Sequence, residues 1–309
     1  MTNAKRYFVT GLDGQVVQSL IQQAANDASV EIIAVGRPTL DLAIPDTIAA
    51  AVMEVNPDLI ISAAAYTAVD QAESESALAR AVNTDGPSAL AETAAKLDIP
   101  IVHISTDYVF DGTKRTPYSE DDALLPLGVY GLSKLGGEKA VAAATNNYAI
   151  LRTAWVYSPF GKNFLKTMLR VAEGRDFVNV VDDQFGNPTS ALDIADAVLA
   201  VSRRLLASSD PALRGVFHMT ATGEASWADF AEEIFKASAE VGGPSARVTR
   251  IPSSDYPTPA QRPTNSRLDC AKLFDAFGVS LPHWQSSTRH TVAEVVQTAR
   301  ATENSGDNK

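Results

Sequence analysis

The sequence predicts an α/β fold, in which a doubly wound parallel sheet carries helices on both faces and a smaller lobe follows. Three observations lead to this prediction. Short apolar runs alternate with segments of helical composition through the first half of the chain. These runs are continuously apolar, as expected for strands buried on both faces. After about residue 155 the alternation loosens, and long loops rich in Pro, Gly and Asn appear at 182–190 and 253–266.

The elements of the first half follow one another in strict alternation. The expected strands are 7–10, 31–35, 59–62, 100–105 and 149–152. The expected helices are 15–28, 45–55, 86–97 and 129–144. Pro45 suits the first position of its helix, and 86–97 is rich in alanine and leucine. Strand–helix–strand units of this kind have right-handed crossovers, so the sheet is expected to be Rossmann-like.

Composition argues against several classes of partner. The formal net charge of -11 repels nucleic acid and anionic membranes, and no basic run is longer than Arg203-Arg204. No apolar run is long enough to cross a bilayer. The four histidines are scattered without metal-ligand spacing, so we expect no metal site. We therefore expect neither a nucleic acid nor a membrane partner.

Two features indicate a cytoplasmic protein. The N-terminal segment 1–6 is short and polar, without the pattern of a signal peptide. The single cysteine, Cys270, fits a reducing compartment. At the other end, 302–309 is polar and is expected to be frayed.

The turn from Gly11 to Gly14 follows the first expected strand and opens a helix. Glycines in such a turn let the backbone approach a pyrophosphate, whose charge then lies at the helix N-terminus. A two-glycine turn alone is more often a plain strand-to-helix connection. Its place in the first unit of the alternating pattern favours the dinucleotide site, whereas Val17 occupies the place of the usual third glycine.

Gly36 and Arg37 end the second expected strand. An acidic residue there would bind the adenosine ribose and reject a 2′-phosphate. Its absence, with Arg37 adjacent, permits NADPH. The alternative is that Arg37 is a solvated loop residue.

Ser105, Thr106 and Asp107 end the fourth strand, where ligands of such sheets bind. Tyr130 and Lys134 lie four residues apart, on one face of their helix. A nearby ammonium is expected to lower the pKa of a tyrosine, which suits proton donation to a ketone that receives hydride from a nicotinamide. A Tyr-Lys pair by itself is commonly a surface pair, so the preceding Ser-Thr-Asp gives it its weight.

A third set of candidates lies on loops of the second half. Arginine binds phosphate bidentately and tryptophan stacks on rings. The set comprises Trp155, Asn187, Arg262, Asn265 and Arg267. Each alone is more often structural, but together they suit a nucleotide diphosphate. We therefore expect an NAD(P)-binding Rossmann-like domain at 1–155 and a mainly substrate-binding lobe at 156–309, with some segments returning to the first domain.

These residues lie in segments that resemble the dTDP-4-dehydrorhamnose reductase family, within the extended short-chain dehydrogenases/reductases. The segments are 11–16 (GLDGQV), 63–70 (AAAYTAVD), 105–112 (STDYVFDG), 129–134 (VYGLSK), 152–157 (RTAWVY), 183–189 (DQFGNPT) and 262–268 (RPTNSRL). The resemblance runs in order over nearly the whole chain. It implies reduction of the C4 ketone of dTDP-4-dehydro-β-L-rhamnose by NADPH or NADH, the last step of dTDP-L-rhamnose biosynthesis.

The resemblance also implies roles for individual residues. Tyr130 is the expected proton donor, Lys134 supports it and holds the nicotinamide ribose, and Thr106 tunes it. Thr106, Asp107 and Trp155 are expected to line the sugar site. The expected cofactor contacts are Gly14, Gln15, Val16, Asp41, Leu42, Ala65, Tyr66, Thr67 and Ile104, together with Tyr130 and Lys134.

The chain departs from the family pattern at several positions. Ser62 stands where asparagine is usual. Some members dimerise through magnesium held by carboxylates, and Ser19 and Leu192 occupy two of those positions, although Glu294 matches a third. We therefore expect no magnesium and a monomer or weak homodimer.

Two alternative functions stay open at this point. A regulatory subunit of methionine adenosyltransferase resembles this family without being a catalyst. The second alternative is a reductase or epimerase that acts on another nucleotide-sugar.

Overall fold

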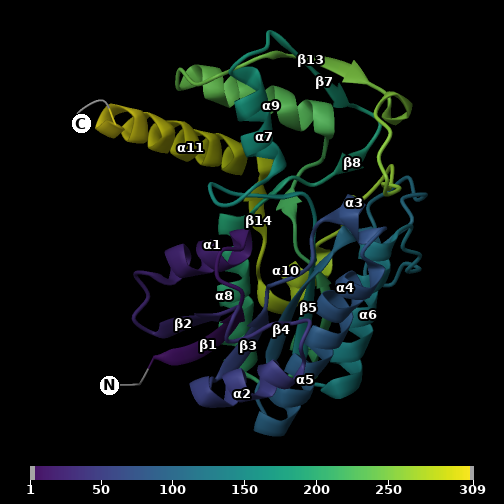
Figure 1. Ribbon diagram of the computed structural model, residues 1–309. Coiled ribbons are helices and arrows are strands. Elements are labelled where there is room, and N and C mark those ends of the chain that lie inside the picture. Colours follow the sequence, from purple (N-terminus) through teal and green to yellow (C-terminus); the bar gives the residue numbers. More distant parts are fainter. Residues whose placement is uncertain (1–3, 307–309) are drawn as a thin grey trace.

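The computed structural model describes residues 4–306, and their side chains through Ala301. Parts of the polar N-terminal segment and of the C-terminal segment expected to be frayed, residues 1–3 and 307–309, lie outside the described residues. Figure 1 shows a twisted sheet flanked by helices, with a second layer of helices and strands beyond one edge of the sheet. The predicted fold class is confirmed.

The main sheet has six parallel strands in the order β2-β1-β3-β4-β5-β10. They are β1 (Lys5–Thr10), β2 (Val30–Val35), β3 (Leu59–Ser62), β4 (Ile101–Thr106), β5 (Tyr148–Thr153) and β10 (Gly215–His218). The first five match the expected strands closely, and β10 comes from the second half of the chain. The order turns back at β1, so the neighbouring carboxyl ends of β1 and β3 form the crevice where ligands of such folds bind.

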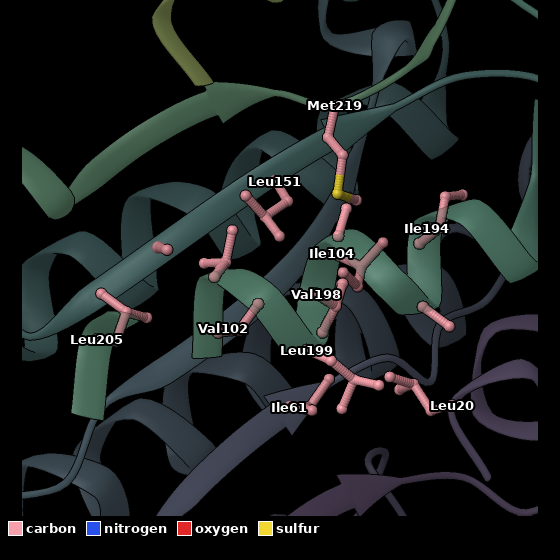
Figure 2. Close-up of a cluster of buried hydrophobic side chains, with 14 of the residues drawn as sticks. Leu20, Ile61, Val102, Ile104, Leu151, Ile194, Val198, Leu199, Leu205 and Met219 are labelled. Atoms are coloured by element: carbon pink, nitrogen blue, oxygen red, sulfur yellow. The ribbon is translucent and has the colours of Figure 1, made fainter. Parts of the chain in front are cut away.

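Helices cover both faces of the sheet. On one face lie α1 (Gln15–Ala24), α8 (Ala191–Ala207) and α10 (Ala271–Phe277), and on the other α2 (Asp46–Val55), α5 (Gly86–Leu97) and α6 (Val129–Ala144). Successive side chains of β1 lie in the cores on opposite faces of the sheet. Tyr7 and Val9 pack with α1 and α8, and Phe8 packs with α2 and α5. Figure 2 shows the first core, where Ile194 and Val198 of α8 meet side chains of β3, β4 and β5.

The connection from β3 to α5 is more structured than the sequence predicted. It contains α3 (Val69–Ala72), α4 (Ser76–Arg80) and a π-helical turn at Ala81–Asp85. Single π turns inside helices occur frequently at functional sites. A 3₁₀ turn, Asp107–Val109, likewise follows β4.

The second lobe has a core of its own, which includes Leu165, Phe230 and Trp284. Its helices are α7 (Phe164–Ala172), α9 (Trp227–Glu240) and α11 (Trp284–Gly306). Its strands pair two by two: β7 (Phe177–Val181) with β13 (Arg247–Ile251), β6 (Val156–Tyr157) with β9 (Thr189–Ser190), β8 (Phe185–Gly186) with β12 (Ala225–Ser226), and β11 (Ala221–Thr222) with β14 (Leu281–His283). In the described part of the chain no helix is long and apolar enough to span a membrane.

Candidate active site

The carboxyl ends of β1, β3, β4 and β5 open into a cleft of about 820 Å³, whose other wall comes from the second lobe. A second cavity of about 650 Å³ lies outside the ends of β1 and β2. Gly11, Asp13, Ala64 and Ala65 border both, so the two form one elongated cleft. Its length and position suit a dinucleotide with a second ligand beside it.

The glycine turn lies at the middle of this cleft. Gly11 has φ +101°, a conformation that favours glycine, and a Cβ there would also make a tight contact of 3.3 Å with the Cβ of Ala64. Gly14 caps α1 without a side-chain hydrogen bond, which leaves the positive end of the helix open to an anion. Val17, in the place of a third glycine, is buried under the turn and packs with the core of α1. These features fit a bound pyrophosphate.

The expected cofactor residues border this cleft. Arg37, Asp41, Leu42 and Tyr66 line the smaller cavity, and Ala65 lines both. Gln15, Val16, Thr67 and Ile104 line the larger one. The Asp41 carboxylate accepts the backbone N–H of Ala43 at 2.9 Å.

Tyr130, Lys134 and Thr106 meet in the larger cavity. The Thr106 hydroxyl donates to Asp107 Oδ1 at 2.9 Å and accepts the N–H of Tyr108 at 3.2 Å. The Tyr130 ring packs edge-on against Tyr108, with 5.5 Å between ring centroids. Three groups separated by up to 28 residues in the sequence thus border the same cavity, as expected from their motifs.

Tyr130 differs from expectation in its ionisation. Burial raises its pKa above the usual value, with a smaller increase from the negative charge of Asp107, and the Thr106 hydrogen bond only partly opposes this. The expected lowering by Lys134 is wrong for this state, because the ammonium contacts the backbone of β4 instead. Tyr130 is therefore a neutral phenol, which is the form that can donate a proton.

Lys134 is held against β4. Its Nζ donates to the carbonyl oxygen of Ile104 at 2.7 Å and lies 3.4 Å from Nε2 of His103. Burial lowers its pKa to about 8, opposed by the charge of Glu138 one turn along α6. Glu138 itself binds Arg152 of β5 through both oxygens, at 2.9 and 2.7 Å.

Asp107 borders the cleft although its side chain is only 2% exposed. Burial raises its pKa to about 6, against the hydrogen bonds it accepts. Its Oδ2 has no partner among the described residues. A buried acceptor without a partner is costly, so this oxygen is suited to a ligand hydroxyl.

Trp155 forms part of an aromatic wall. Its indole stacks on Trp227 of α9, and Phe164 of α7 packs against Trp227 with 4.7 Å between centroids. All three border the cleft. Gly186 is required behind the wall, because a Cβ there would lie 2.4 Å from Cε2 of Trp155.

Arg262 is the one member of the third candidate set, besides Trp155, that borders the cleft. Its Nη2 donates to Asp70 Oδ2 of α3 at 2.8 Å, which joins the 253–266 loop to the sheet domain. Arg262 thus borders the cleft while its guanidinium is paired with Asp70.

The structure corrects the expectation for Asn187 and Asn265, which are buried and do not border the cleft. Asn187 donates to the carbonyl of Gly223 at 2.7 Å and accepts the N–H of Leu268 at 2.9 Å. Asn265 donates to the carbonyls of Lys114 and Thr116. Both side-chain amides thus form hydrogen bonds that hold the loops around the cleft. Arg267 likewise pairs with Glu224.

Several residues of the site had no assignment from the sequence. Asn83, in the π-helical turn, accepts the N–H of Tyr66 at 2.8 Å and donates to the Ser133 hydroxyl at 3.0 Å, so it ties the cofactor loop to the helix of Tyr130. Lys162 and Trp227 border the cleft from the second lobe. The sequence around Trp227 indicates only that a helix begins there, through the capping box of Ser226 and Asp229 at the start of α9. Within the described residues, no group of three His, Cys, Asp or Glu side chains is placed to hold a metal.

Comparisons with known proteins agree with this geometry. The sequence model of one protein family, the RmlD substrate binding domain, matches residues 5–297 of this chain. A dTDP-4-dehydrorhamnose reductase of Sinorhizobium fredii is 54% identical over 287 residues, covering 93% of this chain and 96% of the relative. One of Escherichia coli is 41% identical over 260 residues, covering 84% and 86%.

Solved structures extend the agreement to the fold. A dTDP-4-dehydrorhamnose reductase of Clostridium acetobutylicum superposes with a TM-score of 0.86 at 36% identity, covering 93% of this chain and 98% of that one. One of Bacillus anthracis, solved in complex with NADP, has a TM-score of 0.86 at 32% identity, covering 94% and 99%. The chain therefore belongs to the dTDP-4-dehydrorhamnose reductase family of NAD(P)-dependent oxidoreductases, as its motifs predicted.

Proposed function

We propose that this protein reduces the C4 ketone of dTDP-4-dehydro-β-L-rhamnose to dTDP-β-L-rhamnose with NADPH or NADH, the last step of dTDP-L-rhamnose biosynthesis. The observation that carries the proposal is the meeting of Tyr130, Thr106 and Lys134 in a cleft continuous with the Gly11–Gly14 turn. Reductases similar over nearly the whole chain support the choice of substrate.

The cofactor fits along the cleft in one direction. The open N-terminus of α1 would hold its pyrophosphate, and Arg37 and Asp41 would bind at its adenosine ribose. Bound nicotinamide supplies a hydride to the carbonyl carbon. Lys134 and Ile104, which border the larger cavity, would hold the nicotinamide ribose.

Side chains of the protein supply the proton that the ketone oxygen receives. Tyr130, neutral because of its burial, donates its phenolic proton to the ketone oxygen, which becomes the new hydroxyl. Thr106, whose hydroxyl proton goes to Asp107 Oδ1 in the free protein, turns that proton to the ketone oxygen and shares the hydrogen bond to it. The ammonium of Lys134 stabilises the phenolate left on Tyr130, since opposite charges close together favour the ionised form.

The remaining walls bind the rest of the nucleotide-sugar. Asp107 offers its unpartnered Oδ2 to a sugar hydroxyl. Trp155 and Trp227 pack on the sugar and exclude water from the reacting atoms. Arg262 reaches the diphosphate from the rim.

We further infer a cytoplasmic monomer or weak homodimer without a magnesium site and without a nucleic acid or membrane partner. The net charge of -11 and the single cysteine support this. Ser19 and Leu192, in two positions where carboxylates hold magnesium in some relatives, offer no charged ligand. Light scattering with and without EDTA tests it, and an EDTA-sensitive dimer would contradict it.

The deciding experiment follows NADPH and NADH absorbance with dTDP-4-dehydro-β-L-rhamnose made in situ by the upstream enzymes. Reduction consumes one cofactor per sugar and yields dTDP-rhamnose. An epimerase would recycle its nicotinamide and consume none. A folded protein that oxidises no cofactor but is retained by methionine adenosyltransferase in a pull-down would be a regulatory subunit instead.

A further inference from the structure

His103 lies fully buried in the middle of β4. Its neighbours Val102 and Ile104 belong to the core under α8, so the imidazole points to the opposite face, which α6 covers. The ring has two polar contacts. Its Nδ1 lies 3.0 Å from Oγ of Ser62, its register partner on β3, and its Nε2 lies 3.4 Å from Nζ of Lys134.

The surroundings fix the protonation of this ring. Burial, and then the positive charge of Lys134, hold the pKa of His103 well below its usual value, so the imidazole is neutral. The Lys134 ammonium has donors only, so Nε2 must be the bare acceptor. The single ring proton is then on Nδ1 and is donated to Ser62. The Lys134 ammonium therefore selects the tautomer, and the Ser62 hydroxyl accepts the remaining ring proton.

The contacts of Lys134 account for two of its three N–H donors. One goes to the carbonyl oxygen of Ile104 and one to His103. The third has no partner among the described residues and remains for the cleft that Lys134 borders. Gly137 leaves room for this arrangement, because a Cβ there would lie 2.2 Å from the carbonyl oxygen of Asn83 and 3.5 Å from Nε2 of His103.

We propose that His103, whose Nε2 accepts from Lys134 while Ser62 accepts its Nδ1 proton, is a positioning residue that aims the third N–H of Lys134 into the cleft. The inference rests on the proposed function, because the role of Lys134 towards Tyr130 and the cofactor belongs to that function. A neutral acceptor orients the ammonium without adding a negative charge beside it. Glu138, the carboxylate whose charge acts on Lys134, is already bound by Arg152 and by the Ser105 hydroxyl.

Other ionisable groups face Lys134 less directly. Glu138 is the charge that acts on it through space, and it raises the pKa of Lys134. The ionisable side chains on α6 itself and on the elements packed against it also include Tyr130 and Lys139 of α6, Asp107 and Tyr108 after β4, Tyr148 and Arg152 of β5, Asp70 of α3, Arg80 of α4, Asp85 of the π-helical turn, and Glu92 and Lys96 of α5. Of these, Arg80 pairs with Asp85, and Asp70 with Arg262.

The test compares three variants by kcat, KM and pH profile. His103→Leu removes the acceptor while keeping apolar bulk, and Ser62→Ala removes the acceptor of the Nδ1 proton, which destabilises the tautomer that accepts from Lys134. Since the charged form of Lys134 loses a hydrogen bond, its pKa falls, and the alkaline limb of kcat should move about one pH unit lower. In His103→Gln the amide oxygen can take the place of Nε2, so the alkaline limb of kcat should return to its wild-type pH.

We expect kcat to fall by about 10-fold in His103→Leu, with a smaller change in the KM for the sugar. Circular dichroism and thermal unfolding establish that each variant is folded. A wild-type kcat and alkaline limb in folded His103→Leu overturn the proposal. So does an equal loss in His103→Leu and His103→Gln, since that result assigns His103 a packing role only.

Failure of the proposed function is recognised separately. Wild-type protein without turnover on the dTDP-sugar refutes that function but leaves the geometry around Lys134 to be tested. NMR titration of Lys134 in lysine-labelled protein, assigned with Lys134→Arg, then decides the inference. A lower pKa of Lys134 in both His103→Leu and Ser62→Ala supports it, and an unchanged pKa overturns it.

Discussion

The indole of Trp155 stacks on that of Trp227, with ring centroids 3.6 Å apart and planes 4° from parallel. Trp155 follows β5 of the sheet domain, whereas Trp227 begins α9 of the second lobe, so the pair joins the two walls of the cleft. Trp155 has φ +49°, in the left-handed region that a bulky side chain rarely adopts. The stack offsets that strain and fixes the ring at the substrate cleft.

Gly186→Ala should displace Trp155 without removing any polar group. The new Cβ would lie 2.4 Å from Cε2 of Trp155, and the ring cannot yield without breaking its stack on Trp227. We expect kcat/KM for the nucleotide-sugar to fall about 10- to 100-fold, while cofactor affinity is kept. Gly174→Ala is the matched control, because no atom lies within 4 Å of its Cβ. Equal steady-state constants in the two variants would show that the position of Trp155 does not matter.

Tyr130→Phe should abolish most turnover, because it removes the proton donor and leaves the ring. General acid catalysis typically contributes about 10²–10⁴-fold, and we expect a kcat loss in that range. Cofactor binding, measured by quenching of protein fluorescence, should survive since Lys134 and the glycine turn are unchanged. Tyr108→Phe serves as the control, because Tyr108 is the ring that packs edge-on against Tyr130. Full activity of Tyr130→Phe would remove Tyr130 from the mechanism.

Asp107→Asn should stabilise the protein near neutral pH. Burial raises the pKa of Asp107 from 3.8 to about 6, so the native state favours the protonated carboxyl. The stability from this group is therefore complete below the unfolded pKa and is lost as pH rises through about 6. That loss corresponds to about 3 kcal/mol in the free energy of unfolding.

An asparagine side chain has no such loss, so Asp107→Asn should exceed wild type in stability at pH 7 and lose the advantage near pH 4. Urea unfolding at both pH values measures this. Asp255→Asn, at an exposed carboxylate, controls for the removal of one negative charge. Parallel stability curves for wild type and Asp107→Asn would contradict the argument. A raised KM for the sugar should accompany the gain, since Asp107 borders its site.

The sequence was sufficient where local physics decides the structure. The apolar run of β3 and the helix of Tyr130 have the expected bounds, because continuous burial and helical composition act over neighbouring residues. The sequence did not predict the short helices α3 and α4 before Asn83, because four or five residues are too few to show a helical hydrophobic period. The π-helical turn of Asn83 has no sequence signal of its own.

Tertiary contacts decided the remaining site residues. Nothing local distinguishes an amide that binds a ligand from one that binds a loop carbonyl, so Asn187 and Asn265 were misassigned. Trp227 acquires its role only through Trp155, 72 residues earlier in the chain. The pKa of Tyr130 depends on burial, which the spacing to Lys134 does not reveal.

Arg37→Gln should change the preference between cofactors. Arg37 borders the cavity for the adenosine ribose, and it has no hydrogen-bond or ion-pair partner among the residues that the structure describes. Gly36 before it provides no carboxylate to reject a 2′-phosphate, so the wild type should favour NADPH over NADH. Hydrogen bonds to charged groups contribute about 1.5–3 kcal/mol, so kcat/KM for NADPH should fall about 10- to 100-fold. The value for NADH, which lacks that phosphate, should stay close to wild type. Arg175→Gln, at an exposed and distant arginine, controls for the loss of one positive charge. An unchanged ratio between the two cofactors would make Arg37 a solvated loop residue and would leave the 2′-phosphate without a protein ligand at this position.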